Sequence, residues 1–139
     1  MTDCIIDSNI LVYLADGSES GKHSKAVEWL GSNSSGLKRA GVLLQNLREF
    51  SAAFHKKKAR AEPQEINHWI DVFSRRFDVL SEKLEDTVKA NEFRVEFKTD
   101  FWDALIAASM IRNGIRTIYT ENVKDFEKIR GIDAVNPLK

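Results

Sequence analysis

The stretch from Phe101 to Phe126 constrains the fold of this chain more than any other. Between residues 101 and 111 the only ionisable side chain is Asp103, and the other positions are apolar or small on every side. A helix without a polar face is a buried helix. Asn113-Gly114 then ends it, because glycine readily adopts the left-handed conformation that follows a helix. The β-branched run 116–120 predicts a short inner strand.

A buried helix followed by a buried strand is half of a parallel α/β unit. In such a unit the start of the helix and the end of the strand lie at the same edge of the sheet. Asp103 should therefore approach Asn122 and Asp125, which follow the strand. The carboxyl edge is where open α/β sheets bind ligands. Helix capping explains each acid separately as well, since acids are common in first helical turns.

The rest of the chain repeats this alternation of strands and helices. We expect strands at residues 4–6, near 42–44, at 77–80, 116–120 and 132–135, with amphipathic helices between them. This pattern predicts an α/β fold, a three-layer α/β/α sandwich with a mostly parallel central sheet. With 139 residues and no evident linker, the chain is expected to form one domain, residues 1–139.

Two further acids are predicted at the same edge. Asp7 directly follows the first strand, although it also suits the cap of the next helix. Glu49 lies early in the helix that follows the second strand. Periodicity alone places it on the solvent side, about 140° from the face formed by Leu47, Phe50 and Phe54. Its position near the strand end favours a functional role.

Carboxylates crowded at one edge repel each other and raise one another's pKa unless a cation neutralises them. Mg²⁺ or Mn²⁺, which prefer oxygen ligands, would do so. The three histidines are scattered and Cys4 is the only cysteine, which argues against structural zinc. No glycine-rich phosphate loop or nucleophile elbow is present. A magnesium site built of carboxylates most naturally serves phosphoryl chemistry.

The composition shows neither a membrane-spanning segment nor a net positive charge that would attract nucleic acid. Basic and acidic residues balance at 21 each, so a polyanion would have to meet a local basic patch. The densest run supplies four candidate RNA-binding residues, Lys56, Lys57, Lys58 and Arg60, although such runs usually only solvate a surface. No apolar run approaches a membrane span, and a single cysteine fits a reducing compartment. We therefore expect a cytoplasmic protein.

Four segments together resemble the PIN domain, and more narrowly the VapC-type ribonuclease toxins of type II toxin–antitoxin systems. They are the N-terminal run Ile5-Ile6-Asp7-Ser8-Asn9-Ile10-Leu11, Glu49 in its helix, Phe101-Trp102-Asp103-Ala104-Leu105-Ile106-Ala107-Ala108, and Tyr119-Thr120-Glu121-Asn122-Val123-Lys124-Asp125-Phe126 closing on Val135-Asn136-Pro137. The resemblance covers the whole chain. It implies a PIN-like fold and a metal-dependent endoribonuclease that hydrolyses RNA phosphodiesters with metal-activated water.

The resemblance also implies roles for individual residues. Asp7, Glu49 and Asp103 would hold Mg²⁺ or Mn²⁺, and Asp125 with Asn122 would complete the metal site. The catalytic set would be Asp7, Glu49, Asp103 and Asp125. Asn122 stands where related sequences can carry Asp, so this site has one charge fewer. The implied partners are an RNA substrate, a cognate antitoxin protein and a second copy of the chain in a homodimer.

Two other interpretations remain open at this point. One is a phosphoryl-transfer domain of the haloacid-dehalogenase or receiver type, but Asp7-Ser8-Asn9 lacks the second acid such domains need, and no lysine is convincingly placed. The other is a PIN-fold module that binds RNA or protein without cleaving. Intact acids count against it.

Overall fold

The central sheet has five strands, all parallel, in the order β3-β2-β1-β4-β5. The computed structural model describes residues 1–18, 20–57 and 61–139, the side chains of residues 20 and 57 excepted. The strands are β1 (Cys4–Ile6), β2 (Ala40–Leu43), β3 (Asp78–Leu80), β4 (Thr117–Tyr119) and β5 (Asp133–Val135). The predicted strands are all present, and the α/β sandwich with a parallel sheet is confirmed.

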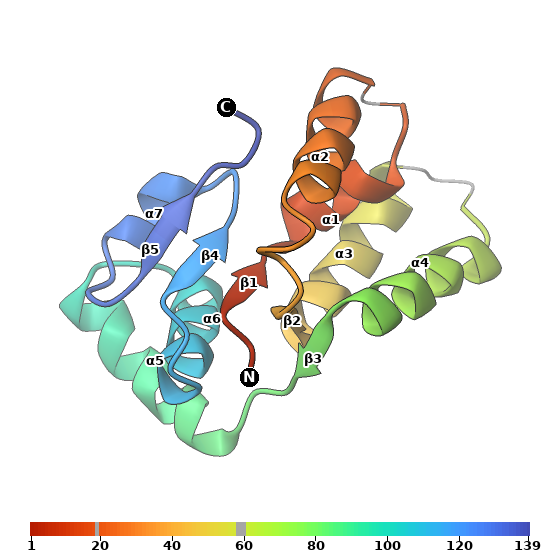
Figure 1. Ribbon diagram of the computed structural model, residues 1–139. Coiled ribbons are helices and arrows are strands. Elements are labelled where there is room, and N and C mark those ends of the chain that lie inside the picture. The colour runs from red at the N-terminus through yellow and green to blue at the C-terminus, as the bar shows by residue number, and fades with distance from the viewer. Residues whose placement is uncertain (19, 58–60) are drawn as a thin grey trace.

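Helices cover both faces of the sheet (Figure 1). The helices are α1 (Ser8–Ala15), α2 (Ser20–Ser32), α3 (Leu44–Lys57), α4 (Pro63–Arg76), α5 (Leu84–Glu96), α6 (Phe101–Arg112) and α7 (Val123–Glu127). Helices α1 to α4 pack on one face, and α5 to α7 pack on the other. None of the helices in the described part of the chain is long and apolar enough to cross a membrane.

Strand β1 divides the hydrophobic core into two halves. Cys4 and Ile6 face the cluster formed with α1 to α4, whereas Ile5 faces the cluster formed with α5 to α7. This follows from the two-residue period of a strand, in which successive side chains point to opposite faces. A strand buried on both faces reads as a continuous apolar run, and this run ends at Asp7.

Helix α6 is buried through most of its length, as predicted, but not at its ends. Residues 104–110 are all buried, whereas Trp102 and Ile111 are 59% and 39% exposed. The expectation of burial on every side was therefore wrong at these two positions. Twelve helical residues span roughly 18 Å, whereas three-residue strands span roughly 10 Å, so the helix ends project past the sheet. Gly114, at φ +71°, ends the helix in the left-handed conformation.

A buried ion pair joins α5 to α6. The Asp86 carboxylate, whose side chain is 2% exposed, accepts hydrogen bonds from Arg112 Nε at 2.7 Å and Arg112 Nη2 at 2.9 Å. It also accepts from the Ser109 hydroxyl at 2.9 Å and from the Lys83 backbone N–H at 2.8 Å. The pair fixes the start of α5 against the end of α6, and so supports the helix that carries Asp103 in its first turn.

We expect Arg112→Ala to lower the free energy of unfolding by about 3 kcal/mol, because it leaves a buried carboxylate without its counter-charge. Urea titration followed by circular dichroism measures this. Arg75→Ala is the matched control, since Arg75 pairs with Asp71 at an exposed position and should cost less than about 1 kcal/mol. Equal losses in the two variants would contradict a supporting role for Asp86 and Arg112.

Candidate active site

Asp7 occupies the centre of the carboxyl edge. It directly follows β1, and its side chain caps α1 by accepting from the Ser8 backbone N–H at 2.8 Å. The same oxygen accepts from the Asn46 amide at 3.3 Å, and the other accepts from the Thr120 hydroxyl at 2.7 Å. Burial raises the pKa of Asp7, and the hydrogen bonds from Thr120 and Ser8 partly offset that rise. Asp7 is therefore both the predicted cap and a buried acid.

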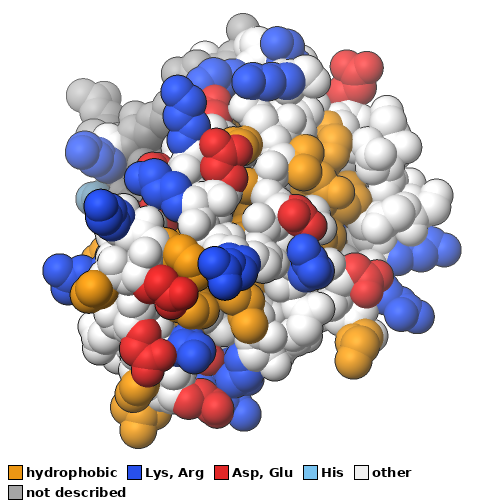
Figure 2. Space-filling model, turned by 90° about the vertical axis from the view of Figure 1, so that its left-hand side faces the viewer, with side chains coloured by type: hydrophobic (Ala, Val, Ile, Leu, Met, Phe, Trp, Pro, Cys, Tyr) orange, Lys and Arg blue, Asp and Glu red, His pale blue; other side chains and the backbone are white. Residues whose placement is uncertain are grey.

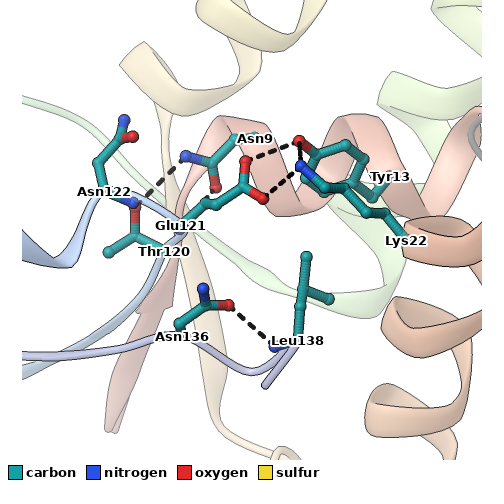
Figure 3. Close-up of polar contacts among 8 residues, drawn as sticks. All are labelled: Asn9, Tyr13, Lys22, Thr120, Glu121, Asn122, Asn136 and Leu138. Atoms are coloured by element: carbon teal, nitrogen blue, oxygen red, sulfur yellow. Dashed lines mark hydrogen bonds and ion pairs between the residues drawn. The ribbon is translucent and has the colours of Figure 1, made fainter.

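Thr120, at the end of β4, connects Asp7 to the segment that carries Asn122. Its hydroxyl donates to Asp7 and accepts from the Asn122 backbone N–H at 3.0 Å. The Asn9 side-chain amide also approaches the hydroxyl, at 3.4 Å. Figure 3 shows Asn9, Thr120 and Asn122 converging from α1 and from the segment between β4 and α7. Thr120 is fully buried, and its hydroxyl links the ends of β1 and β4 at the site.

A second group of polar side chains extends this network towards α2. The Glu121 carboxylate accepts from the Tyr13 hydroxyl at 2.7 Å and pairs with Lys22 Nζ at 2.7 Å (Figure 3). The Glu121 backbone N–H donates to Asn9 Oδ1 at 3.2 Å. These contacts connect the turn after β4 to α1 and α2, and so fix the position of that turn at the carboxyl edge of the sheet.

Asp103 and Asp100 form a pair at the start of α6. The Asp100 side chain caps the helix by accepting from the backbone N–H groups of Trp102 and Asp103, at 2.8 and 3.1 Å. Burial, the hydrogen bond to Asp100 and repulsion by Asp100, Asp7 and Asp125 together raise the pKa of Asp103 to about 8. Burial opposes ionisation of Asp100 as well, but the hydrogen bonds it accepts lower its pKa overall. Asp103 therefore keeps a proton at neutral pH.

Glu49 lies near Asp7, although helix periodicity placed it on the solvent side. Its side chain is half-buried, and burial followed by repulsion from Asp7 raises its pKa. Weaker repulsion comes from Asp100 and Glu82. The first turns of α3 face other segments at this edge. Periodicity considers only the core-facing side of the helix, so it wrongly predicted that Glu49 would be exposed to solvent.

Asn122 and Asp125 are the more peripheral members of the predicted set. Both are exposed, and the Asn122 side chain makes no capping hydrogen bond although it occupies the N-cap of α7. Asp125 is close enough to Asp103 for its charge to raise the pKa of Asp103. The five predicted ligands thus lie in one region.

The predicted RNA-binding residues are only partly covered by the structure. Lys56 is exposed near the end of α3. The side chain of Lys57, and Lys58 and Arg60 as a whole, lie outside the described residues. Elsewhere the surface mixes charges: the face in Figure 2 carries cationic and anionic side chains among exposed apolar ones. The role of these four residues stays a prediction.

Besides the helix cap Asp100, three residues at this edge were not predicted as site residues. Asn46 and Thr120 donate hydrogen bonds to Asp7, and the charge of Glu82 helps to raise the pKa of Glu49. Glu82 could have been found, because it follows β3 at the same carboxyl edge as the other acids. Asn46 and Thr120 could not, since their amide and hydroxyl groups gain a role only through contacts with residues far away in the sequence.

The model of the PIN domain family matches residues 4–132. The chain belongs to the PIN domain family. This assignment removes the haloacid-dehalogenase and receiver alternatives. A search of the curated proteins found no match.

Solved structures share the fold of this PIN domain at low sequence identity. VapBC from Salmonella typhimurium, solved with bound DNA, matches with a TM-score of 0.73 and 20% identity over 99% of each chain. VapBC2 from Rickettsia felis, bound to a promoter DNA fragment, matches with a TM-score of 0.72 and 20% identity over 97% of this chain and 98% of that one. VapC20 from Mycobacterium tuberculosis, a toxin that cleaves the sarcin–ricin loop, matches with a TM-score of 0.72 and 18% identity over 90% and 93%.

The edge of this PIN domain is an acidic oxygen-rich site rather than a preformed metal cage. Among the described residues, no three His, Cys, Asp or Glu side chains stand close enough together to hold a metal ion as they lie. The donor set nonetheless suits a hard cation. Burial raises the pKa of Asp7, Glu49 and Asp103, and repulsion by Asp7 adds to the rise at Glu49 and Asp103; such shifts are typical of acids that lack a neutralising charge.

The pKa of Asp103 predicts how stability depends on pH in chelator. Asp103 keeps its proton in the folded chain up to about pH 8, whereas an unfolded Asp ionises near pH ~4. Between these values the folded state binds more protons than the unfolded state, so the free energy of unfolding should fall as pH rises. Asp7 and Glu49 act in the same direction, because their pKa values are also raised.

Urea titrations in EDTA between pH 5 and 8.5 measure this dependence. Asp103→Asn should flatten it and raise stability at the alkaline end, since it removes the charge without removing the side-chain volume. Asp71→Asn, at an exposed position, is the control and should keep the wild-type slope. A wild-type protein that grows more stable from pH 5 to 8 would contradict the pKa shifts.

Proposed function

We propose that this PIN domain is a divalent-metal-dependent endoribonuclease, and that it is the toxin of a toxin–antitoxin pair. The observation that carries the proposal is the convergence of Asp7, Glu49 and Asp103 at one sheet edge, where burial raises the pKa of each acid and repulsion by Asp7 adds to the rise at Glu49 and Asp103. Acids whose pKa values are raised in this way reduce the stability of the folded chain, and they are concentrated at functional sites. The PIN family and the toxin neighbours supply the reaction class.

Mg²⁺ or Mn²⁺ would be held by Asp7, Glu49 and Asp103, with Asp125 and Asn122 at the periphery. When bound, such an ion activates water and stabilises the leaving oxygen of a phosphodiester. Thr120 and Asn46 fix the Asp7 carboxylate by hydrogen bonds. Asp103 has to release its proton before it can act as a ligand, and Asp100 receives the hydrogen bond that now keeps that proton in place.

The proposed protein partner is a cognate antitoxin. Three of the similar structures are toxin–antitoxin complexes, from Klebsiella pneumoniae, Rickettsia felis and Salmonella typhimurium. A homodimer is proposed on the same family ground. An antitoxin segment laid across the carboxyl edge would keep RNA away from the acids.

Cleavage of a labelled mixed RNA pool tests the reaction. We expect cutting with Mg²⁺ or Mn²⁺, none with EDTA, and a loss of at least a hundredfold in Asp7→Asn and in Asp103→Asn. Asp71→Asn is the control, because Asp71 is exposed and lies within α4 rather than beside a strand end. This variant should cut RNA as the wild type does. Equal cutting by the wild type and both site variants would identify a contaminating nuclease. RNA binding without cutting by the wild type would favour the alternative, a PIN-fold binding module.

Metal binding can be tested without activity. A ligand that binds only the folded state at 100 times its Kd stabilises that state by about 2.7 kcal/mol. Saturating Mn²⁺ should therefore raise the Tm of the wild type at pH 8 by several degrees. Asp103→Asn should lose most of that rise, and Asp71→Asn should retain it. Equal rises in all three proteins would place the ion elsewhere.

A further inference from the structure

A groove of about 460 Å³ lies beside the acids, between α3 and α6. Its walls include Glu49 and Arg48 from α3, Trp102 and Leu105 from α6, and Glu82 from the segment after β3. Glu49 is shared with the catalytic edge, and Trp102 immediately precedes Asp103. The groove is therefore continuous with the site at which the phosphodiester would be cut. Its volume lies within the range of roughly 300–1,000 Å³ found for pockets that take small ligands.

Trp102 gives the groove an exposed aromatic wall. Trp102 is 59% exposed, whereas residues 104–110 of the same helix are buried. Its indole meets the Phe101 ring edge-on, with 5.1 Å between the ring centroids. Exposed aromatic rings beside a site that binds the phosphate backbone are the usual surfaces on which the bases of a single-stranded nucleic acid stack.

The polar groups of the groove are mainly hydrogen-bond acceptors. Glu82 Oε1 accepts from the Gln45 backbone N–H at 2.9 Å, which positions the carboxylate at the start of α3. No other partner of Glu82 is found among the described residues. The Gln45 amide nitrogen donates to the Trp102 carbonyl at 3.3 Å, and Gln45 Oε1 is a buried acceptor without a partner in the described part of the chain.

Arg48 is the cation of the groove. Its side chain is exposed, and no ion pair to it is found within residues 1–18, 20–57 and 61–139. A guanidinium beside two carboxylates suits a ligand with a phosphate at one end and hydrogen-bond donors at the other. A nucleotide with an amino group on its base has this distribution.

We propose that the groove binds one unpaired nucleobase of the RNA substrate, and that it selects bases that carry an exocyclic amino group. The base stacks on Trp102, its amino group donates to Glu82, and Arg48 contacts the adjoining phosphate. Uracil, which has no amino group, gains only the stacking contact. The inference rests on the proposed function, because it takes the acids at the edge as the site where the strand is cut.

Binding of fluorescein-labelled RNA nonamers in Ca²⁺ tests the groove separately from cleavage. Wild-type protein should bind oligo(A) and oligo(C) about tenfold more tightly than oligo(U). Trp102→Ala should weaken binding of all three about tenfold, and Trp102→Phe should restore most of it. Glu82→Gln should abolish the preference, since a carboxamide also donates to the uracil carbonyl, yet it keeps the acceptor for Gln45. Glu85→Gln, an exposed acid nearby in sequence, is the matched control.

Each outcome separates this inference from the proposed function. RNA cleavage by the wild type, with base preference unchanged in Glu82→Gln and affinity unchanged in Trp102→Ala, would overturn the base site and leave the nuclease. The predicted binding pattern without cleavage under any metal would support the base site and overturn the nuclease. Absence of RNA binding would overturn the base site, and loss of binding to a purified antitoxin in Trp102→Ala would then identify the groove as a protein contact.

Discussion

The pairing of β1 with β4 is the constraint on which the rest of the site depends. It sets Ile6 beside Tyr119, so the residues that follow the two strands meet although 113 positions separate Asp7 from Thr120. The Thr120 hydroxyl then bonds to Asp7, and the Asp7 backbone N–H donates to the Tyr119 carbonyl at 3.0 Å. A slip of one residue would reverse the faces of β1 and place Asp7 in a hydrophobic layer. The register that builds the core therefore also builds the site.

The acids at this edge oppose folding, and within the described residues fixed hydrogen bonds rather than ion pairs compensate for Asp7. Asp7 accepts from Ser8, Asn46 and Thr120, and Asn46 is itself held because its Oδ1 accepts from the Leu43 backbone N–H at 2.8 Å. The buried Asp86, by contrast, has its own arginine. The difference is informative: the chain neutralises the structural acid Asp86 with its own arginine, whereas Asp7 is held by hydrogen bonds alone within the described residues, which agrees with the proposed binding of a cation at this edge.

The fold was largely predictable from the sequence because the apolar periodicities are strong. Short apolar runs between amphipathic helices specify buried parallel strands, and the parallel arrangement places the ends of all strands at one edge. Asp7 and Asp103 follow directly from that topology. The topology also placed Glu49 near this edge, but its partial burial could not be predicted, because it depends on contacts with segments that are distant in the sequence. Asn46 and Thr120 were missed for the same reason. Trp102 was wrongly expected to be buried, because apolar character alone does not distinguish a side chain in the core from an exposed one that lines a groove.

Capping and function are not competing explanations of the acids at this edge. Asp7 caps α1, as the sequence suggested, and Asp100 caps α6. In a parallel α/β sandwich the helix that follows each strand begins at the carboxyl edge, so the caps are placed in the site by the topology itself. The backbone N–H groups that a cap satisfies also favour its negative charge. Asp100 is ionised partly for that reason, and its charge helps to keep the proton on Asp103. A residue that begins the helix thus also sets the protonation state of its neighbour in the site.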